Sequence, residues 1–189
     1  MFTTIDVPGA SFTEAFGINS RGDIVGYYIN AAGTHGFLLR KGAFTTIDAP
    51  GAVFTAAVGI NSKRDIVGSF TAKVADGTGF HGFLLRKGVL TTIDAPGAFF
   101  TRAFGINNRG DIVGHYRDAE ALHGFLLHKG TFTPIQITLT TEALGINSEG
   151  DIVGGYSDAT GTHGFLTHIV SSDDSGGPEG HGGDSDQRE

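Results

Sequence analysis

The sequence contains no cysteine, no tryptophan, one methionine and only five prolines among its 189 residues. Without cysteine there are no disulfides and no thiol chemistry, and a zinc site would need histidine and carboxylate ligands alone. No run of about 18 apolar residues could form a transmembrane helix, and the first residues do not read as a signal peptide. A net charge of −7 argues against a general nucleic-acid binder. We therefore expect no nucleic-acid or membrane partner, and a cytoplasmic location for the chain as given.

Glycine and phenylalanine are abundant, with 31 and 15 residues, and 39% of the chain is hydrophobic. A chain of this size and composition can bury a core without metals or disulfides. Glycines spread evenly between Phe, Ile and Val indicate many short strands joined by tight turns. No segment has a sustained helical period. These features predict an all-β domain.

Four phrases recur in the same order along the chain. Gly-Ile-Asn begins at residues 17, 59, 105 and 145, and Asp-Ile-Val-Gly and then His-Gly-Phe-Leu follow each time. The fourth phrase is Phe-Thr-Thr-Ile-Asp or a close variant, at 2–6, 44–48, 90–94 and 132–136. Each phrase reads as one short strand, and four antiparallel strands in about 40 residues are typical of a propeller blade. We predict a four-bladed β-propeller with blades at about 13–48, 55–94, 101–137 and 141–170.

The order of strands at the two ends of the repeat predicts a closed ring. The chain begins with a fourth-type strand, residues 2–6, and the last unit ends on a third-type strand. Residues 1–6 are therefore expected to fill the open edge of the last blade. Residues 171–189 carry six acidic residues against one arginine and little apolar content, which predicts a disordered acidic tail.

The phrases Gly-Ile-Asn-x-x-Gly-Asp-Ile-Val-Gly and His-Gly-Phe-Leu resemble the bacterial HAF repeat family, named for a His-Ala-Phe triplet where this chain has His-Gly-Phe. The resemblance covers residues 1–170. It implies an extracellular β-propeller repeat protein, in contrast to the missing signal peptide, and it implies no reaction, cofactor or catalytic residue.

Residues that are identical in all four units are expected to specify the blade. The asparagine and aspartate of each first turn suit side-chain to backbone hydrogen bonds. The small residues of each first strand, such as Ala15 and Gly17, suit a close approach at a narrow axis. We expect no cofactor, although an ion in the axial channel stays open as an alternative. The four repeat histidines are weak metal candidates, because each begins a third strand away from the axis, and a hydrogen bond within the blade is the favoured interpretation: His35, His81, His123 and His163.

Function is expected where the units differ, because a symmetric scaffold must break its symmetry to recognise an asymmetric ligand. One position of the first strand carries Glu14, Ala56, Arg102 and Glu142. The corresponding positions of the second strand carry Tyr27, Ser69, His115 and Gly155, and two residues later Ile29, Thr71, Arg117 and Ser157. The predicted ligand-binding residues are Arg102, Arg117, His115, Tyr27, Glu14 and Glu142, and the candidates for catalysis are His115, Glu14 and Glu142. The alternative is that these positions are exposed and have drifted.

Three functions follow from these residues, in this order. The first is a monomeric binding module for a small polar or anionic ligand, a glycan or a protein, held at the face with the irregular loops. The second is a small enzyme that uses a histidine and a glutamate as acid and base and an arginine to position the substrate. The third is a structural or assembly protein.

Overall fold

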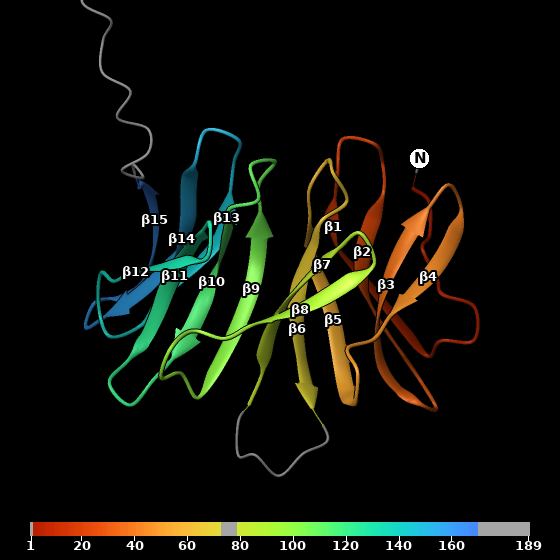
Figure 1. The fold of residues 1–189 in the computed structure, drawn as a ribbon, viewed down its shortest axis with the longest axis horizontal. Helices are drawn as coiled ribbons and strands as arrows, with labels where there is room; N and C mark the ends of the chain where they lie inside the picture. The colour runs from red at the N-terminus through yellow and green to blue at the C-terminus, as the bar shows by residue number, and fades with distance from the viewer. Residues whose placement is uncertain (1, 73–78, 170–189) are drawn as a thin grey trace, which may run out of the picture.

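The computed structural model describes residues 2–72 and 79–169. The expected acidic tail and residues 73–78 of the longest predicted loop lie outside these ranges. The described residues form fifteen β-strands and no helix (Figure 1). Accordingly, this part of the chain has no helix that could span a membrane. The all-β prediction is confirmed.

The strands fall into four consecutive units, each an antiparallel meander. The strands of unit 1 are β1 (Phe12–Ile18), β2 (Ile24–Asn30), β3 (Gly33–Arg40) and β4 (Ala43–Ile47). Those of unit 2 are β5 (Ala52–Ile60), β6 (Ile66–Ala72), β7 (His81–Arg86) and β8 (Val89–Ile93).

Units 3 and 4 continue the pattern, but unit 4 has only three strands. Unit 3 contains β9 (Phe100–Ile106), β10 (Ile112–Arg117), β11 (Leu122–His128) and β12 (Thr131–Ile135). Unit 4 contains β13 (Thr141–Ile146), β14 (Asp151–Asp158) and β15 (Gly161–His168). One parallel bridge, Thr34 to Phe54, joins units 1 and 2 into a single sheet, and another, Leu122 to Thr140, lies between units 3 and 4.

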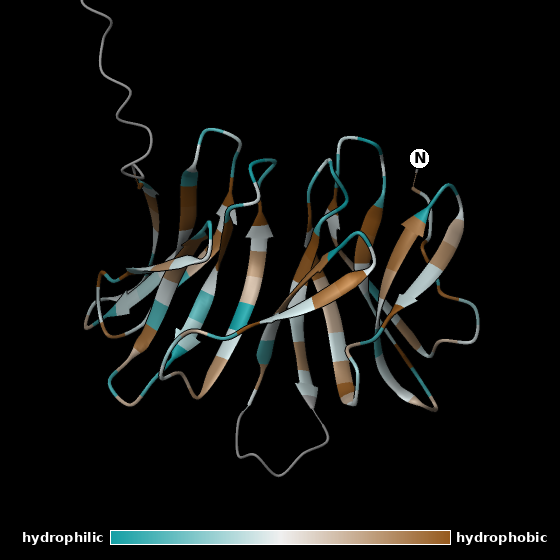
Figure 2. Ribbon diagram, viewed as in Figure 1, coloured by the Kyte–Doolittle hydropathy of each residue, from teal (hydrophilic) through white to brown (hydrophobic). Residues whose placement is uncertain are grey.

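The hairpin turns follow directly from the sequence. In the turn between β3 and β4, Lys41 and Gly42 have φ values of 50° and 80°, and the Lys-Gly pairs of units 2 and 3 are similar. Two residues with positive φ form the turn whose twist matches that of paired strands. Apolar residues lie mainly on the strands, whereas turns along the upper edge of Figure 2 are mostly hydrophilic.

Neighbouring units pack face to face through three similar cores. The first joins Val25 and Ile47 of unit 1 to Ala57, Ile66 and Phe83 of unit 2, and equivalent residues join units 2 and 3 and units 3 and 4. Phe83 and Phe125 are fully buried in the first and second of these cores, and Phe37 is fully buried in a smaller cluster with Val7 and Tyr28 on unit 1.

The inner strands approach each other closely, as the small residues of the first strand predicted. A Cβ atom on Gly17 would lie 2.6 Å from the carbonyl oxygen of Val58, and one on Gly59 would lie 2.5 Å from that of Phe104. Both distances are shorter than any van der Waals contact, so only glycine permits this spacing between neighbouring units.

The two end units do not meet in this structure. The chain starts at the red end of the ribbon and finishes at the blue end, with units 2 and 3 between them (Figure 1). The expected strand at 2–6 does not form, and unit 4 has no fourth strand among the described residues. No closed sheet is present among the described residues, which form four β-meander units.

The missing contact leaves apolar residues of the two end units exposed. Val153 of unit 4 is 50% exposed, whereas the equivalent valines of units 1 to 3 are fully buried. Leu166 is 71% exposed, against 6% for Leu126 in unit 3. On the facing side of unit 1, Ile18 is 67% exposed, against 8% for Ile106.

Candidate functional site

The divergent positions lie opposite one another on paired strands. Glu14 of β1 pairs with Tyr27 of β2, and Arg102 of β9 pairs with His115 of β10. Directly opposed residues project from the same face of a sheet. The register therefore places Glu14 beside Tyr27 and Arg102 beside His115, whereas the cross-strand partner of Glu142 is Gly155.

Three of the six predicted ligand-binding residues come together between units 3 and 4. The Nδ1 atom of His115 lies 3.3 Å from the Oε1 atom of Glu142, which belongs to β13. Arg102 is the cross-strand neighbour of His115. Its guanidinium lies 3.6 Å from the centre of the Phe80 ring of unit 2. We call Arg102, His115 and Glu142 the polar cluster.

Aromatic rings enclose the polar cluster. The rings of Phe100 and Phe104 lie 5.8 and 5.0 Å from the imidazole of His115. The arginine is likewise held above phenylalanine, an arrangement that favours its charge through the quadrupole of the ring. His115 is only 6% exposed.

Burial controls the charge of the cluster. Desolvation, followed by repulsion from Arg102, lowers the pKa of His115 to about 4, so the imidazole is neutral at pH 7. The Glu142 carboxylate would favour the protonated form, but its side chain is 39% exposed and its effect is screened by water. Burial also lowers the pKa of Arg102, and Glu142 opposes that shift; the guanidinium remains the cation of the cluster.

Two nitrogens of the polar cluster are buried without a hydrogen-bond partner among the described residues. They are Nε of Arg102 and Nδ1 of His115, whose 3.3 Å contact with Glu142 lacks the geometry of a hydrogen bond. Buried polar atoms are nearly always satisfied, so an unsatisfied pair on adjacent strands marks a place where another polar group can bind.

Tyr27 and Glu14 belong to the same row of side chains but lie at its other end, in unit 1. Burial and a hydrogen bond to Glu14 raise the pKa of Tyr27. The Tyr27 ring lies 6.2 Å from Phe54, which lies 5.4 Å from Phe80, the ring beneath Arg102. An aromatic row thus connects the two groups of predicted residues. The sixth residue, Arg117, is exposed and has no contact with the cluster within the described ranges.

Sequence reasoning missed the phenylalanines of this row. Phe54 lies two residues before the variable position of its first strand, and Phe100 occupies the same place in unit 3. That spacing puts them on the strand face that carries the candidates. The signal was therefore present in the sequence.

The repeat histidines make hydrogen bonds within their own units. Nδ1 of His35 lies 2.9 Å from Asp48, and the His35 ring stacks on Tyr28. His81 is placed in the same way, 3.0 Å from Asp94. His123 is hydrogen-bonded through Nδ1 to the side-chain oxygen of Gln136, while its Nε2 has only an ion-pair contact with Asp118, at 3.0 Å. Nε2 of His163 lies 3.3 Å from Asp158. No three potential metal-ligating side chains cluster in residues 2–72 and 79–169.

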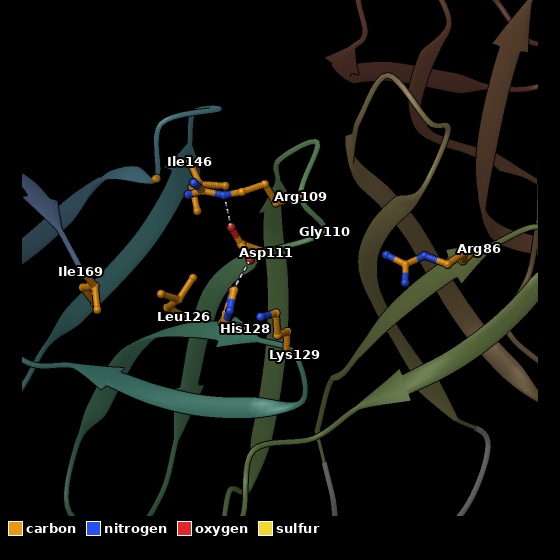
Figure 3. A pocket seen from close by; sticks show the side chains of 10 residues that line it. Arg86, Arg109, Gly110, Asp111, Leu126, His128, Lys129, Ile146 and Ile169 are labelled. Atoms are coloured by element: carbon orange, nitrogen blue, oxygen red, sulfur yellow. Dashed lines mark hydrogen bonds and ion pairs between the residues drawn. The ribbon is translucent and has the colours of Figure 1, made fainter. Parts of the chain in front are cut away.

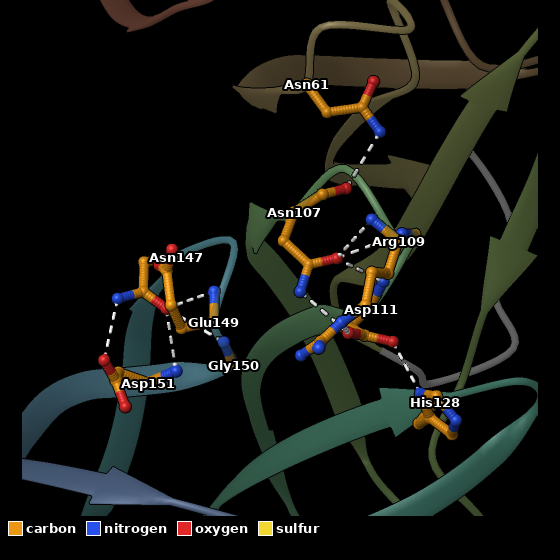
Figure 4. Close-up of polar contacts among 10 residues, drawn as sticks. Asn61, Asn107, Arg109, Asp111, His128, Asn147, Glu149, Gly150 and Asp151 are labelled. Atoms are coloured by element: carbon orange, nitrogen blue, oxygen red, sulfur yellow. Dashed lines mark hydrogen bonds and ion pairs between the residues drawn. The ribbon is translucent and has the colours of Figure 1, made fainter. Parts of the chain in front are cut away.

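The turn asparagines hold the loop between the first and second strands (Figure 4). The side-chain oxygen of Asn107 accepts hydrogen bonds from the backbone nitrogens of Arg109, Gly110 and Asp111, and its amide donates to the Asp111 carboxylate. The amide of Asn61 donates to the backbone oxygen of Asn107 in the next unit. These contacts agree with the structural role expected for the turn.

A separate cavity of about 350 Å³ lies between units 3 and 4, near the turns (Figure 3). The sequence analysis did not foresee it. The one sequence feature that indicates this cavity is His128, which occupies the repeat position that is Arg40 in unit 1 and Arg86 in unit 2. Its Nδ1 atom lies 2.6 Å from the buried carboxylate of Asp111.

No family model matches the chain, and no curated protein is significantly similar to it. The fold and the arrangement of the side chains are therefore the basis for a functional proposal.

Proposed function

We propose that the chain is a four-bladed β-propeller that binds a small polar ligand through an anionic group at the polar cluster of Arg102, His115 and Glu142. The observation that carries the proposal is the unsatisfied pair of buried nitrogens on Arg102 and His115. A charged guanidinium beside a neutral imidazole suits a carboxylate or a similar oxyanion, which accepts hydrogen bonds from both.

Ring closure is supported by the three cores that already exist between neighbouring units. Each core combines a second-strand valine and a fourth-strand isoleucine of one unit with the first-strand alanine and third-strand phenylalanine of the next. Contact between unit 4 and unit 1 would build a fourth core of the same composition. It would bury Val153, Leu166 and Ile18, each worth about 1.5–3 kcal/mol when fully removed from water.

Half of this fourth core is already assembled on unit 1. Val7 packs with Tyr28 and Phe37, and Ile5 lies beside them. The backbone nitrogen of Val7 donates to the hydroxyl of Thr13, just as that of Ala49 donates to Thr55 in the next unit. Residues 5–7 therefore contact unit 1 as residues 47–49, the end of the fourth strand of unit 1, contact unit 2. Pairing with β15 would complete this arrangement.

The register of the other units fixes how β15 would pair. Gly36 pairs with Ile47, Gly82 with Ile93, and the third unit follows the same rule. The equivalent partner of Gly164 is Ile5. This pairing brings Asp6 to His163, and so repeats the contact between His35 and Asp48.

A closed ring leaves neither end face unpaired, which supports a monomer. The four recurring phrases support membership of the HAF repeat family.

The contact between His115 and Glu142 also favours a second candidate function, acid–base catalysis. At neutral pH the uncharged His115 would serve as the proton acceptor in such a reaction.

Loss of the Arg102 charge tests ligand binding. We expect the protein to bind glucuronate, used as a carboxylate probe, with millimolar affinity, and Arg102→Gln to weaken binding at least tenfold. A hydrogen bond to a charged group contributes about 1.5–3 kcal/mol, which corresponds to at least that factor. Affinity is measured by ligand-observed NMR, with glucose as the uncharged comparison.

Arg117→Gln is the matched control, because it removes an exposed arginine that lies two residues after His115 on β10. Its affinity for glucuronate should equal that of the unaltered protein. Equal loss in both variants would indicate a general charge effect and contradict binding at the cluster. Turnover of a substrate that is lost in His115→Gln would instead support the enzyme.

A further inference from the structure

The cavity between units 3 and 4 is separate from the polar cluster and has a different character. None of its lining residues belongs to that cluster. Three of the ten are cationic, Arg86, Arg109 and Lys129, and one is acidic, Asp111. Apolar side chains of Leu126, Ile146 and Ile169 form the rest of its wall. Figure 3 shows Arg109, Asp111 and His128 together, with Arg86 contributed by unit 2.

The single carboxylate of the cavity is fully used by the protein. Burial would raise the pKa of Asp111, but hydrogen bonds from Asn107, His128 and Arg109 outweigh it and lower the pKa. Arg109 contacts Asp111 through Nε, at 3.0 Å. The terminal nitrogens of its guanidinium are further donors, and one of them lies close to Gly150.

His128 adds an oriented nitrogen to this group. Asp111 holds the Nδ1 side of the ring, so the opposite nitrogen, Nε2, is fixed in direction. That Nε2 atom is buried and has no hydrogen-bond partner among the described residues. Arg86 is paired with Asp65 at 3.1 Å, so Arg109 is the cation that lies beside this buried polar atom, which a ligand can satisfy.

The corresponding place between units 1 and 2 is filled by the protein itself. Unit 2 has Arg64 where units 3 and 4 have Gly110 and Gly150. The Nε atom of Arg64 reaches back 2.7 Å to Asp23 of unit 1. At Gly150, by contrast, the guanidinium of Arg109 occupies the space that a Cβ atom would need. Arg86 has the same relation to Gly110 at the junction of units 2 and 3, and both arginines line the cavity.

We propose that this cavity binds a small molecule through a phosphate or carboxylate group, held by Arg109, Lys129 and, with the ring protonated, the Nε2–H group of His128. Its volume of about 350 Å³ accommodates a small organic anion. Planar, paired donors of arginine match the oxygens of either group.

Titration of the full chain with inorganic phosphate tests this site. We expect the ring resonances of His128 to shift, with a millimolar dissociation constant, and the double variant Arg109→Gln, Lys129→Gln to bind at least tenfold more weakly. The matched control is Arg21→Gln, Lys41→Gln, which removes the equivalent cations of unit 1. Unchanged affinity in the first variant, or equal loss in both, would overturn the proposal.

A carboxylate from the acidic residues beyond Ile169 could bind in the cavity in place of a free anion. A chain ending at residue 170 distinguishes the two sources. Tighter phosphate binding by the shortened chain, still dependent on Arg109, would support the site and identify the acidic segment as its competitor. Absence of binding by both chains would refute it. Arg102→Gln should leave the phosphate-dependent shift of the His128 resonances unchanged, so this readout is independent of the polar cluster.

Discussion

Replacing Leu166 with aspartate is expected to lower the free energy of unfolding by at least about 3 kcal/mol, since closure would bury this side chain between unit 4 and unit 1. In the open arrangement Leu166 is 71% exposed, and such a substitution changes stability by no more than about 0.5 kcal/mol. The two arrangements thus predict results that differ several-fold. Urea unfolding measures the difference.

Two substitutions calibrate this measurement. Leu126→Asp changes the equivalent residue of unit 3, which is buried already, and should be strongly destabilising in either arrangement. Val89→Asp changes an exposed residue of β8 away from the unit interfaces and should have little effect. If Leu166→Asp behaves like Val89→Asp, the ring does not close.

The absence of cysteine allows a second, independent test of closure. The register of the other units makes Phe2 the cross-strand neighbour of Thr167, as Phe44 is of Leu39. The double variant Phe2→Cys, Thr167→Cys is expected to form a disulfide within one chain upon oxidation. A disulfide between two chains would instead mean that a second copy covers the exposed end faces, and it would contradict closure within the monomer.

The local part of the fold could be predicted from the sequence, because hairpins depend on nearby residues. The Lys-Gly turns and the four repeated phrases predicted sixteen strands, and each of them except 2–6 forms. The relation between unit 4 and unit 1 could not be settled in this way. It depends on the twist accumulated over all four units, which no local pattern determines.

In the candidate site, too, pairing within a unit could be predicted from the sequence, and contacts between units could not. Pairing of Arg102 with His115 follows from the strand register, which the repeat makes visible in the sequence. The contact of His115 with Glu142 and the ring of Phe80 beneath Arg102 join different units. They depend on the spacing between sheets. The Asp111 and His128 pair was missed because its residues lie 17 positions apart on strands that were treated as uniform scaffold.

Stability is expected to fall by about 3 kcal/mol between pH 7 and pH 4 because His115 must be protonated in a buried position. Its pKa is about 4 in the folded protein, against 6.5 for an exposed histidine. In this window the unfolded chain binds more protons, so acid favours unfolding. The contribution of neutral His115 is complete above pH 6.5 and is lost as the pH falls to 4. A shift of about 2.5 units corresponds to about 3 kcal/mol.

The variant His115→Gln isolates this effect, since it keeps a polar side chain in the same place and cannot be protonated. The difference in unfolding free energy between the two proteins, measured with urea at several pH values, should change steeply between pH 6.5 and 4. Carboxylates with lowered pKa values, such as Asp23 and Asp111, contribute equally to both proteins and so cancel in the difference. A difference that stays constant would show that Glu142 compensates the buried charge, and that the cluster can hold a protonated histidine.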